Sequence, residues 1–216
     1  MKGKERSSFV WNSLRTLYPD VECTLEVEED PFRLFVRGIL SAQCTDFRVN
    51  EVCRTLFLKY PDMEAFARAK EEAVGEDIRA CGLYRAKARG LVRSSHILIE
   101  KYGGTIPSDP RILETLPGVG RKIANLVAGE IYGVPAIVVD THCGRVSHRL
   151  GLSQSTVPAK IEKDLMRQFP ESQWITLGHL MVAHGRSLCM ARTPHCEDCP
   201  MRKVCDFGKK RFAEKK

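Results

Sequence analysis

Apolar residues recur at helical spacing along almost the whole chain. Near the N-terminus one such stripe consists of Phe9, Val10, Leu14 and Leu17. Apolar side chains three or four positions apart lie on one face of an α-helix. Residues 134–139 are the only plausible strand, and Pro135 and the short length favour an extended connector there. The pattern predicts an all-α fold.

Composition limits the kind of partner. The chain has 216 residues, 43% of them hydrophobic, which is enough for a well-formed core in one or two domains. Its formal net charge is +7, which favours a polyanion, with nucleic acid as the leading candidate. Part of the excess lies between Met201 and Lys216, where seven basic residues face two acidic ones. We expect this tail to be frayed and solvated.

No segment of the sequence predicts targeting to a membrane or insertion into one. The start, MKGKERSSFVW, has no apolar run behind its charges and is not a signal peptide. The least polar segment, Ile131 to Val139, is about half as long as a membrane-spanning helix. We therefore expect a cytoplasmic protein without membrane association. We also expect a monomer, because nothing argues for an oligomer.

The nine cysteines fall into two groups. Five are scattered, and we expect small, buried, inert side chains: Cys23, Cys44, Cys53, Cys81 and Cys143. The other four are spaced C-x6-C-x2-C-x5-C: Cys189, Cys196, Cys199 and Cys205. Four thiolates can hold zinc or an iron-sulfur cluster. Structural zinc usually takes two close pairs, and only one is present here, so the spacing favours a cubane cluster.

The stretch LPGVGRK predicts a turn between two helices. Asp109 and Pro110 are typical of a helix start, which predicts a short helix over 109–115, and a second helix begins at Arg121. Gly118 and Gly120 permit a tight turn and a close approach of phosphate to backbone amides. The segment predicts a helix-hairpin-helix in which Gly118, Val119 and Gly120 bind the DNA backbone. The alternative is a plain corner between two helices.

These motifs resemble a known family. LPGVGRK is followed by VDTH, with Asp140 eighteen residues after Lys122, and then by the four-cysteine pattern. LSAQCTD (residues 40–46), CGLYRAKA (81–88) and HGRSLC (184–189) occur in the same order. Together they resemble endonuclease III, the bifunctional DNA glycosylase and abasic-site lyase of the helix-hairpin-helix superfamily.

The resemblance implies two helical lobes and a substrate. One lobe is a six-helix barrel, residues 24–134, and the other is a cluster domain made of residues 1–23 and 135–216. Lys122 and Asp140 are expected on opposite walls of the cleft between them. The implied substrate is duplex DNA carrying an oxidised pyrimidine or an abasic site, and the implied cofactor is a 4Fe-4S cluster with a mainly structural role.

Lys122 and Asp140 are the candidate catalytic residues. The base must be flipped out before its sugar carbon C1' is accessible. Lys122 then attacks C1' and forms a Schiff base, and a desolvated helix N-terminus helps the amine to be neutral. Asp140 helps to remove the amine proton and stabilises positive charge on the sugar. Taken alone, Lys122 reads as a solvated lysine and Asp140 as a helix cap before Thr141.

Further residues match positions that contact DNA in the family. Gln43 would fill the space left by the flipped nucleotide, and Leu83 would wedge into the base stack. Their alternatives are a helix-end amide and a core leucine. His142 would reach a phosphate, with capping or packing as the alternative.

Three further positions bear on the resemblance to the family. Arg192 and His195, between the first two clustered cysteines, are candidates for phosphate contacts. Cys44 occupies a position where alanine is common in the family, a difference that we expect to matter little.

Two other classes of function remain open. A monofunctional glycosylase acting on mispaired bases would lack a lysine at position 122. A non-catalytic DNA-binding or redox-sensing iron-sulfur protein would keep the turn and the cysteines without needing both Lys122 and Asp140.

Overall fold

The structure is a computed structural model that describes residues 3–213. Within this range the chain forms helices, turns and irregular connectors and no strand, so the all-α prediction is confirmed. Residues 134–139 form a connector that is neither helix nor strand, so the expectation that they are not a strand is confirmed. No helix in the described range is long and apolar enough to cross a membrane.

The chain divides into two compact units, which are described separately. Residues Cys23–Val134 form the first, here called the middle unit. The described residues before Cys23 and after Val134 form the second, here called the terminal unit. The first and last segments of the chain therefore fold together.

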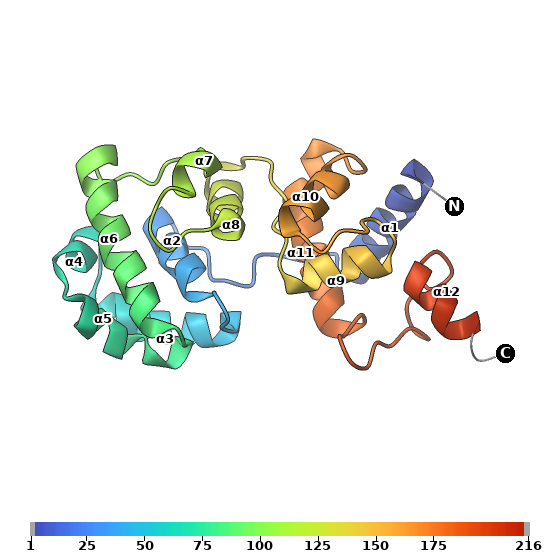
Figure 1. The fold of residues 1–216 in the computed structure, drawn as a ribbon, viewed down its shortest axis with the longest axis horizontal. Helices are drawn as coiled ribbons and strands as arrows, with labels where there is room; N and C mark the ends of the chain where they lie inside the picture. Colours follow the sequence, from blue (N-terminus) through green and yellow to red (C-terminus); the bar gives the residue numbers. More distant parts are fainter. Residues whose placement is uncertain (1–2, 214–216) are drawn as a thin grey trace. The chain divides into compact units, whose positions relative to one another are not determined.

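In the middle unit, helices pack around one long helix, α6 (Tyr84–Tyr102) (Figure 1). The helices before it are α2 (Pro31–Leu40), α3 (Asp46–Lys59), α4 (Met63–Arg68) and α5 (Glu71–Asp77), followed by the short 3-10 helix η1 (Arg79–Cys81). Those after it are α7 (Pro110–Leu113) and α8 (Arg121–Tyr132). Helices α4, α5 and α2 contact α6, and α2 also contacts α8. Phe35, Leu91 and Leu98 are fully buried in the core.

Helix boundaries in the middle unit follow the expected signals. Asp109 caps α7 by accepting a hydrogen bond from the Arg111 amide at 2.9 Å, and Pro110 occupies the first turn. Helix α6 ends at Gly103, whose φ of 59° is left-handed. The expected helix over 109–115 is shorter than predicted, because the chain leaves the α-helix after Leu113 to enter the glycine turn.

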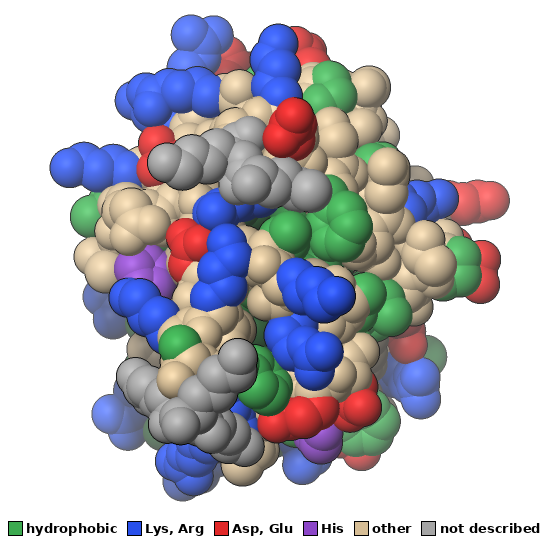
Figure 2. All heavy atoms as spheres, turned by 90° about the vertical axis from the view of Figure 1, so that its right-hand side faces the viewer, with side chains coloured by type: hydrophobic (Ala, Val, Ile, Leu, Met, Phe, Trp, Pro, Cys, Tyr) green, Lys and Arg blue, Asp and Glu red, His purple; other side chains and the backbone are tan. Residues whose placement is uncertain are grey.

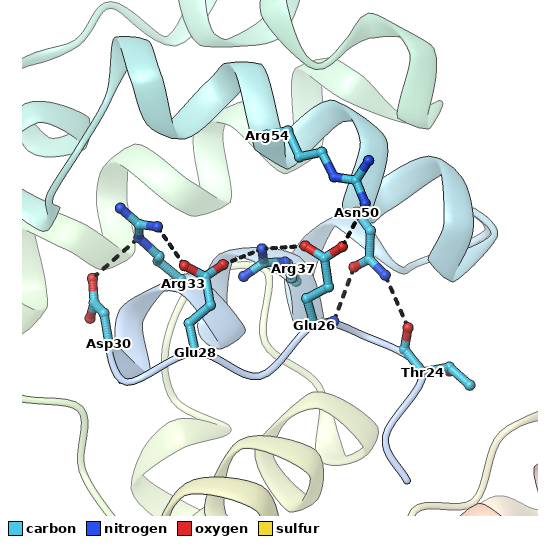
Figure 3. Close-up of polar contacts among 8 residues, drawn as sticks. All are labelled: Thr24, Glu26, Glu28, Asp30, Arg33, Arg37, Asn50 and Arg54. Carbon is cyan, nitrogen blue, oxygen red and sulfur yellow. Dashed lines mark hydrogen bonds and ion pairs between the residues drawn. The ribbon is translucent and has the colours of Figure 1, made fainter. Parts of the chain in front are cut away.

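A network of ion pairs and hydrogen bonds fastens the segment before α2 to α2 and α3 (Figure 3). The Arg37 side chain is 2% exposed, and its Nη2 donates to carboxylate oxygens of Glu26, at 3.0 Å, and of Glu28. Arg54 of α3 donates to the other Glu26 oxygen at 3.0 Å. Asn50 of α3 donates to the Thr24 carbonyl at 3.0 Å. Side chains from two helices thus fix the entry of the chain into this unit.

The terminal unit is built from both ends of the chain. Its helices are α1 (Lys4–Leu17), α9 (Thr141–Arg149), α10 (Pro158–Met166), η2 (Glu171–Gln173), α11 (Trp174–Ser187) and α12 (Asp206–Ala213) (Figure 1). Helix α11 contacts both α9 and α1. Val10 of α1 and Met181 of α11 are fully buried in one shared core.

A charged clasp joins α1 to α12. Arg6 donates from Nη1 and Nη2 to the two Asp206 carboxylate oxygens, each at 3.1 Å, and also to the Leu150 carbonyl at 3.1 Å. Gly151 lies beneath the clasp, where a Cβ atom would come within 2.0 Å of Asp206 Oδ2. The expectation of a frayed C-terminal tail is therefore wrong as far as Ala213, because the clasp and the packing of α12 on α9 order it. Residues 214–216 lie outside the described range.

Candidate functional site

The glycine turn between α7 and α8 is held against α6 by close backbone packing. Gly118 has a φ of 81°, which favours glycine. A Cβ atom on Gly90 of α6 would lie 3.2 Å from both Gly118 Cα and the Pro117 carbonyl oxygen. Ser94 Oγ also donates to that carbonyl at 2.8 Å. Val119 is buried, so within the turn its side chain serves packing and only its backbone is suited to an external ligand.

Helix α8 begins directly after this turn without a side-chain cap. Gly120 occupies the N-cap position and has no side chain to offer to the first amides. Lys122, in the first turn of α8, is half-buried, and its side chain makes no hydrogen bond or salt bridge within residues 3–213. The start of α8 is thus suited to binding an anion. The Lys122 amine lies beside it and forms no ion pair with a carboxylate of the described residues.

The charge of Lys122 acts on the Cys23 thiol. Burial raises the pKa of the Cys23 thiol to about 12, the charge of Glu130 adds to this, and the positive charge of Lys122 opposes it. Cys23 and Cys44 are only partly buried, so the expectation of buried thiols is wrong for these two. It is confirmed for the other three scattered cysteines: Cys53, Cys81 and Cys143.

Asp140 caps α9 in the terminal unit. Its Oδ1 accepts a hydrogen bond from the Cys143 amide at 2.8 Å, so the capping role is real. No hydrogen bond to Oδ2 occurs among the described residues. One oxygen fixes the orientation of the carboxylate, and the other remains suited to a ligand.

Gln43 and Leu83 share an unusual backbone conformation. Their φ angles are 52° and 48°, and in the described range no other residue except glycine has a positive φ. Such a conformation costs about 1–3 kcal/mol in a residue with a Cβ atom, and it concentrates at functional sites. Both side chains are exposed, Leu83 by 53%. The alternative of a core leucine is therefore wrong for Leu83.

His142 is tied into the terminal unit by its neighbours. It is half-buried, and its Nδ1 lies 3.2 Å from Arg145 Nη2. The same Arg145 nitrogen donates to the Gly185 carbonyl at 2.7 Å. These contacts agree with the packing alternative for His142.

The four clustered cysteines line one pocket. Its empty volume is about 340 Å³, open solvent included, and its walls contain Cys189, Cys196, Cys199 and Cys205 together with His184 and Phe207. Within the described range, no three Cys, His, Asp or Glu side chains converge closely enough to hold a single metal ion. The thiols surround a shared void and do not meet at one point.

Arg149 and His184 support this loop, and neither is among the site residues predicted from the sequence. Arg149 Nη1 donates to the Met190 carbonyl at 2.7 Å and lies 3.4 Å from Cys189 Sγ. The buried His184 has its Nε2 3.8 Å from Cys199 Sγ, and its Nδ1 lies 3.1 Å from the Tyr18 hydroxyl. HGRSLC contains His184, but only folding brings α9 and α1 to the loop.

Burial favours protonated thiols in this pocket when no cation is near. It raises the pKa of Cys199 to about 11, and it raises the pKa of Cys196 and of Cys205 as well. A bound metal reverses this preference because it binds the thiolate directly. The donor set is therefore suited to soft metal ions.

Positive charge on one face of the terminal unit is dispersed. Figure 2 shows Lys and Arg side chains spread over one face, with Asp and Glu among them. Arg192 and His195 are both exposed on the cysteine loop and are therefore accessible. The net charge alone does not define a docking patch on this face.

Comparison with known proteins gives the family. The model of the HhH-GPD superfamily base excision DNA repair protein matches residues 36–171. Endonuclease III of Bacillus subtilis is 42% identical over 212 residues, which cover 98% of this chain and 96% of that protein. A solved non-covalent endonuclease III–DNA complex superposes with a TM-score of 0.94 at 42% identity, covering 99% of this chain and 100% of that one. A trapped endonuclease III–DNA covalent intermediate has the same TM-score and identity, with 98% and 100% covered.

The fold and the glycine turn thus define a helix-hairpin-helix protein of base excision repair. Within that superfamily, the chain belongs to the endonuclease III family. The resemblance drawn from the sequence motifs is confirmed.

Proposed function

We propose that the protein removes oxidised pyrimidines from duplex DNA and then cleaves the strand at the resulting abasic site. The observation that carries the assignment is Lys122, a half-buried residue in the first turn of α8, directly after the glycine turn, whose amine has no ion-pair partner among the described residues. A monofunctional glycosylase or a non-catalytic DNA-binding protein has no use for such an amine.

Lys122 is the proposed nucleophile. Its neutral amine attacks C1' of the flipped nucleotide, the bond from C1' to the base breaks, and the base leaves with the bonding electron pair and a proton. The sugar ring opens to give an imine between Lys122 Nζ and C1'. The imine acidifies the C2' hydrogen, and β-elimination expels the 3' phosphate.

Asp140 is proposed to assist this chemistry from the terminal unit. Its Oδ1 is held by the Cys143 amide, which fixes the orientation of the carboxylate. Oδ2 would accept the proton that the Lys122 amine must lose and would stabilise positive charge on the sugar.

The glycine turn is proposed to bind the DNA backbone, and the loops that carry Gln43 and Leu83 are proposed to insert side chains into the duplex. The amides around Gly118 and Gly120 would bind a phosphate without reading sequence, because they contact only the backbone of the DNA. Gln43 and Leu83 would occupy the space of the flipped nucleotide and separate the neighbouring bases. A role of His142 at a phosphate also remains part of the proposal.

Borohydride trapping tests the assignment of Lys122. With a duplex that carries one thymine glycol, the unaltered protein should give a covalent adduct, and Lys122→Gln should give none. Lys101→Gln, which alters an exposed lysine of α6, is the matched control and should trap normally. An adduct that persists in Lys122→Gln would exclude Lys122 as the nucleophile. Asp140→Asn should keep duplex binding and lose most base removal.

The cysteine loop is proposed to hold a 4Fe-4S cluster. Each thiolate of a cubane binds a different iron, so sulfurs arranged around a shared void fit a cluster better than one zinc ion. Cys189, Cys196, Cys199 and Cys205 would be its ligands. The cluster would supply four covalent links across a loop that has little regular structure of its own. We accordingly propose that residues 24–134 are the glycosylase barrel and that the remainder is the cluster domain.

Iron content and colour test the cofactor. Purified protein should be brown, with visible charge-transfer absorbance and about four irons per chain. Colourless protein with one zinc per chain would contradict the proposal. The test is independent of catalysis, since it needs no DNA.

A further inference from the structure

A buried lysine links the two loops that carry Gln43 and Leu83. Lys87 lies in the first turn of α6 and is 4% exposed. Its Nζ donates to the Leu40 carbonyl at 2.8 Å and to the Cys81 carbonyl at 2.7 Å. Leu40 lies three residues before Gln43 in the sequence. Cys81 lies two residues before Leu83. One ammonium group therefore joins the chain just before each of the two exposed side chains.

The charge of Lys87 is costly in this buried position. No carboxylate of the described residues forms an ion pair with it, and burial lowers the pKa of Lys87 below its ordinary value. The two carbonyl oxygens offset part of this cost, and the Leu40 carbonyl lies at the end of α2, where the helix dipole favours a cation. An apolar side chain of similar length would fill the same space without burying a charge. What the ammonium group adds is a link between two segments that are distant in the sequence.

On the first loop, a short turn connects Leu40 to Gln43. The Cys44 amide donates to the Ser41 carbonyl at 3.2 Å, which closes a turn around Gln43. Within that turn Gln43 has a φ of 52°. Because the turn is closed by its own hydrogen bond, the Leu40 carbonyl that Lys87 holds determines where Gln43 lies.

On the second loop, the connection to Leu83 is shorter still. Only Gly82 separates Leu83 from Cys81, and the φ angles of Gly82 and Leu83 are 65° and 48°. The Leu83 carbonyl accepts a hydrogen bond from the Lys87 backbone amide at 3.1 Å. Lys87 therefore holds the second loop at two points, with its ammonium group before Leu83 and with its amide at Leu83.

We propose that Lys87 is a positioning residue that sets the separation of Gln43 and Leu83, so that both side chains enter one opened base stack. The inference rests on the proposed function of these two residues. Lys87 is too deeply buried to contact DNA, so its effect reaches the duplex only through the two loops. An opened stack is stabilised only while the wedge and the filling side chain both occupy it.

Duplex binding by Lys87→Met tests the link. Methionine keeps the length and the apolar stem of the side chain and removes the ammonium group. One duplex carries a tetrahydrofuran abasic analogue, which cannot form an imine, and the other carries no lesion. Affinity for the lesion duplex should fall about tenfold, because the opened stack loses support. Affinity for the undamaged duplex should be unchanged, because the glycine turn still binds the DNA backbone. An equal loss for both duplexes, or a loss for neither, would overturn the proposal.

Stack opening is measured directly with 2-aminopurine placed opposite the lesion, at saturating protein. The unaltered protein should raise the fluorescence, because the base loses its stacking neighbours. Lys87→Met should raise it less, even when all the duplex is bound. An equal rise would overturn the proposal. No rise with the unaltered protein would instead contradict the proposed entry of Gln43 and Leu83 into the duplex.

Two further variants separate positioning from stability. Leu98 is fully buried and lies eleven residues further along α6, so Leu98→Ala creates a cavity away from both loops. It should keep the preference for the lesion duplex, and a loss as large as that of Lys87→Met would show that lowered stability alone explains the effect. Lys87→Gln keeps N–H donors on a shorter, neutral side chain and should lose less of the preference. If Lys87→Met does not fold, Lys87→Gln carries the test, and an unchanged preference in it would then overturn the proposal.

Discussion

Gln43 and Leu83 show how a single residue can be costly for the fold and useful for the site. Their role in DNA binding is implied by resemblance, and the structure adds a physical property that the sequence does not display: both are strained and exposed. Strain of this kind persists where function requires it. Substitutions at the two positions separate the cost to the fold from the contribution to DNA binding.

Leu83→Ala should slow base removal about tenfold or more. The wedge stabilises an opened base stack, and unstacking costs a few kcal/mol, of which each 1.4 kcal/mol is a factor of ten. Leu58→Ala is the matched control, because Leu58 is an exposed leucine of the same unit, on α3. Single-turnover kinetics on a duplex with one lesion measures the difference. Equal rates for the two variants would remove Leu83 from the proposed DNA interface.

Gln43→Gly should raise the free energy of unfolding by about 1 kcal/mol while lowering base removal. Glycine adopts the left-handed conformation of position 43 without steric cost, whereas Gln43→Ala keeps a Cβ atom and most of the strain. Both variants lose the amide proposed to fill the gap in the duplex. Denaturant unfolding of the two proteins tests the strain, and a glycine variant no more stable than the alanine variant would contradict it.

At the scale of helices, the contact between α6 and the glycine turn positions the start of α8 and therefore Lys122. Gly90 and Gly118 let two backbones approach closely, and Ser94 anchors the Pro117 carbonyl. The sequence suggested a reason for Gly118, a turn, but none for Gly90, which lies inside a helix. Since a helical glycine costs about 1 kcal/mol relative to alanine, its benefit must come from this packing.

Gly90→Ala should destabilise the protein by about 1–3 kcal/mol and weaken DNA binding. The added methyl group would meet backbone atoms of Pro117 and Gly118 at 3.2 Å, so the turn must move. Gly75→Ala in α5 is the control. Its methyl group would lie 3.4 Å from the nearest atom, a Tyr84 ring carbon, which is ordinary contact. Thermal unfolding and duplex binding that are the same for both variants would contradict this role of Gly90.

Seen as a whole, the protein joins the two ends of its chain in one unit. The Arg6–Asp206 clasp and the cysteine loop both lie in the terminal unit, and the middle unit has its own core. The two units therefore depend on the proposed cluster to different extents.

Removal of iron should loosen the terminal unit far more than the middle unit. Without the metal, the four-cysteine loop loses its cross-links, and the packing of α12 and α9 weakens. Hydrogen exchange followed by mass spectrometry should show faster exchange in residues 188–213 and in α9, with α6 still protected. Equal acceleration in α6 would show that the proposed cluster also supports the middle unit.

Much of the molecule follows from the sequence by itself. Helical periodicity, caps such as Asp109 and the glycine turn are local signals, because they depend on residues a few positions apart. They predicted the all-α fold and the start of α8 at Arg121. The motif order predicted the family. The predicted length of the helix after Asp109 was less accurate, because its last predicted residues belong to the turn that follows.

What only the tertiary structure decided is which distant residues meet. The closeness of Gly90 to Gly118 and the support of the cysteine loop by Arg149 join positions that no local pattern relates. Arg6, near the N-terminus, also orders the C-terminal segment by donating to Asp206 at the start of α12. The sequence determines which helices form, because propensity and periodicity act locally. Contacts between helices depend on the packing of the whole core, and a local pattern does not contain that information.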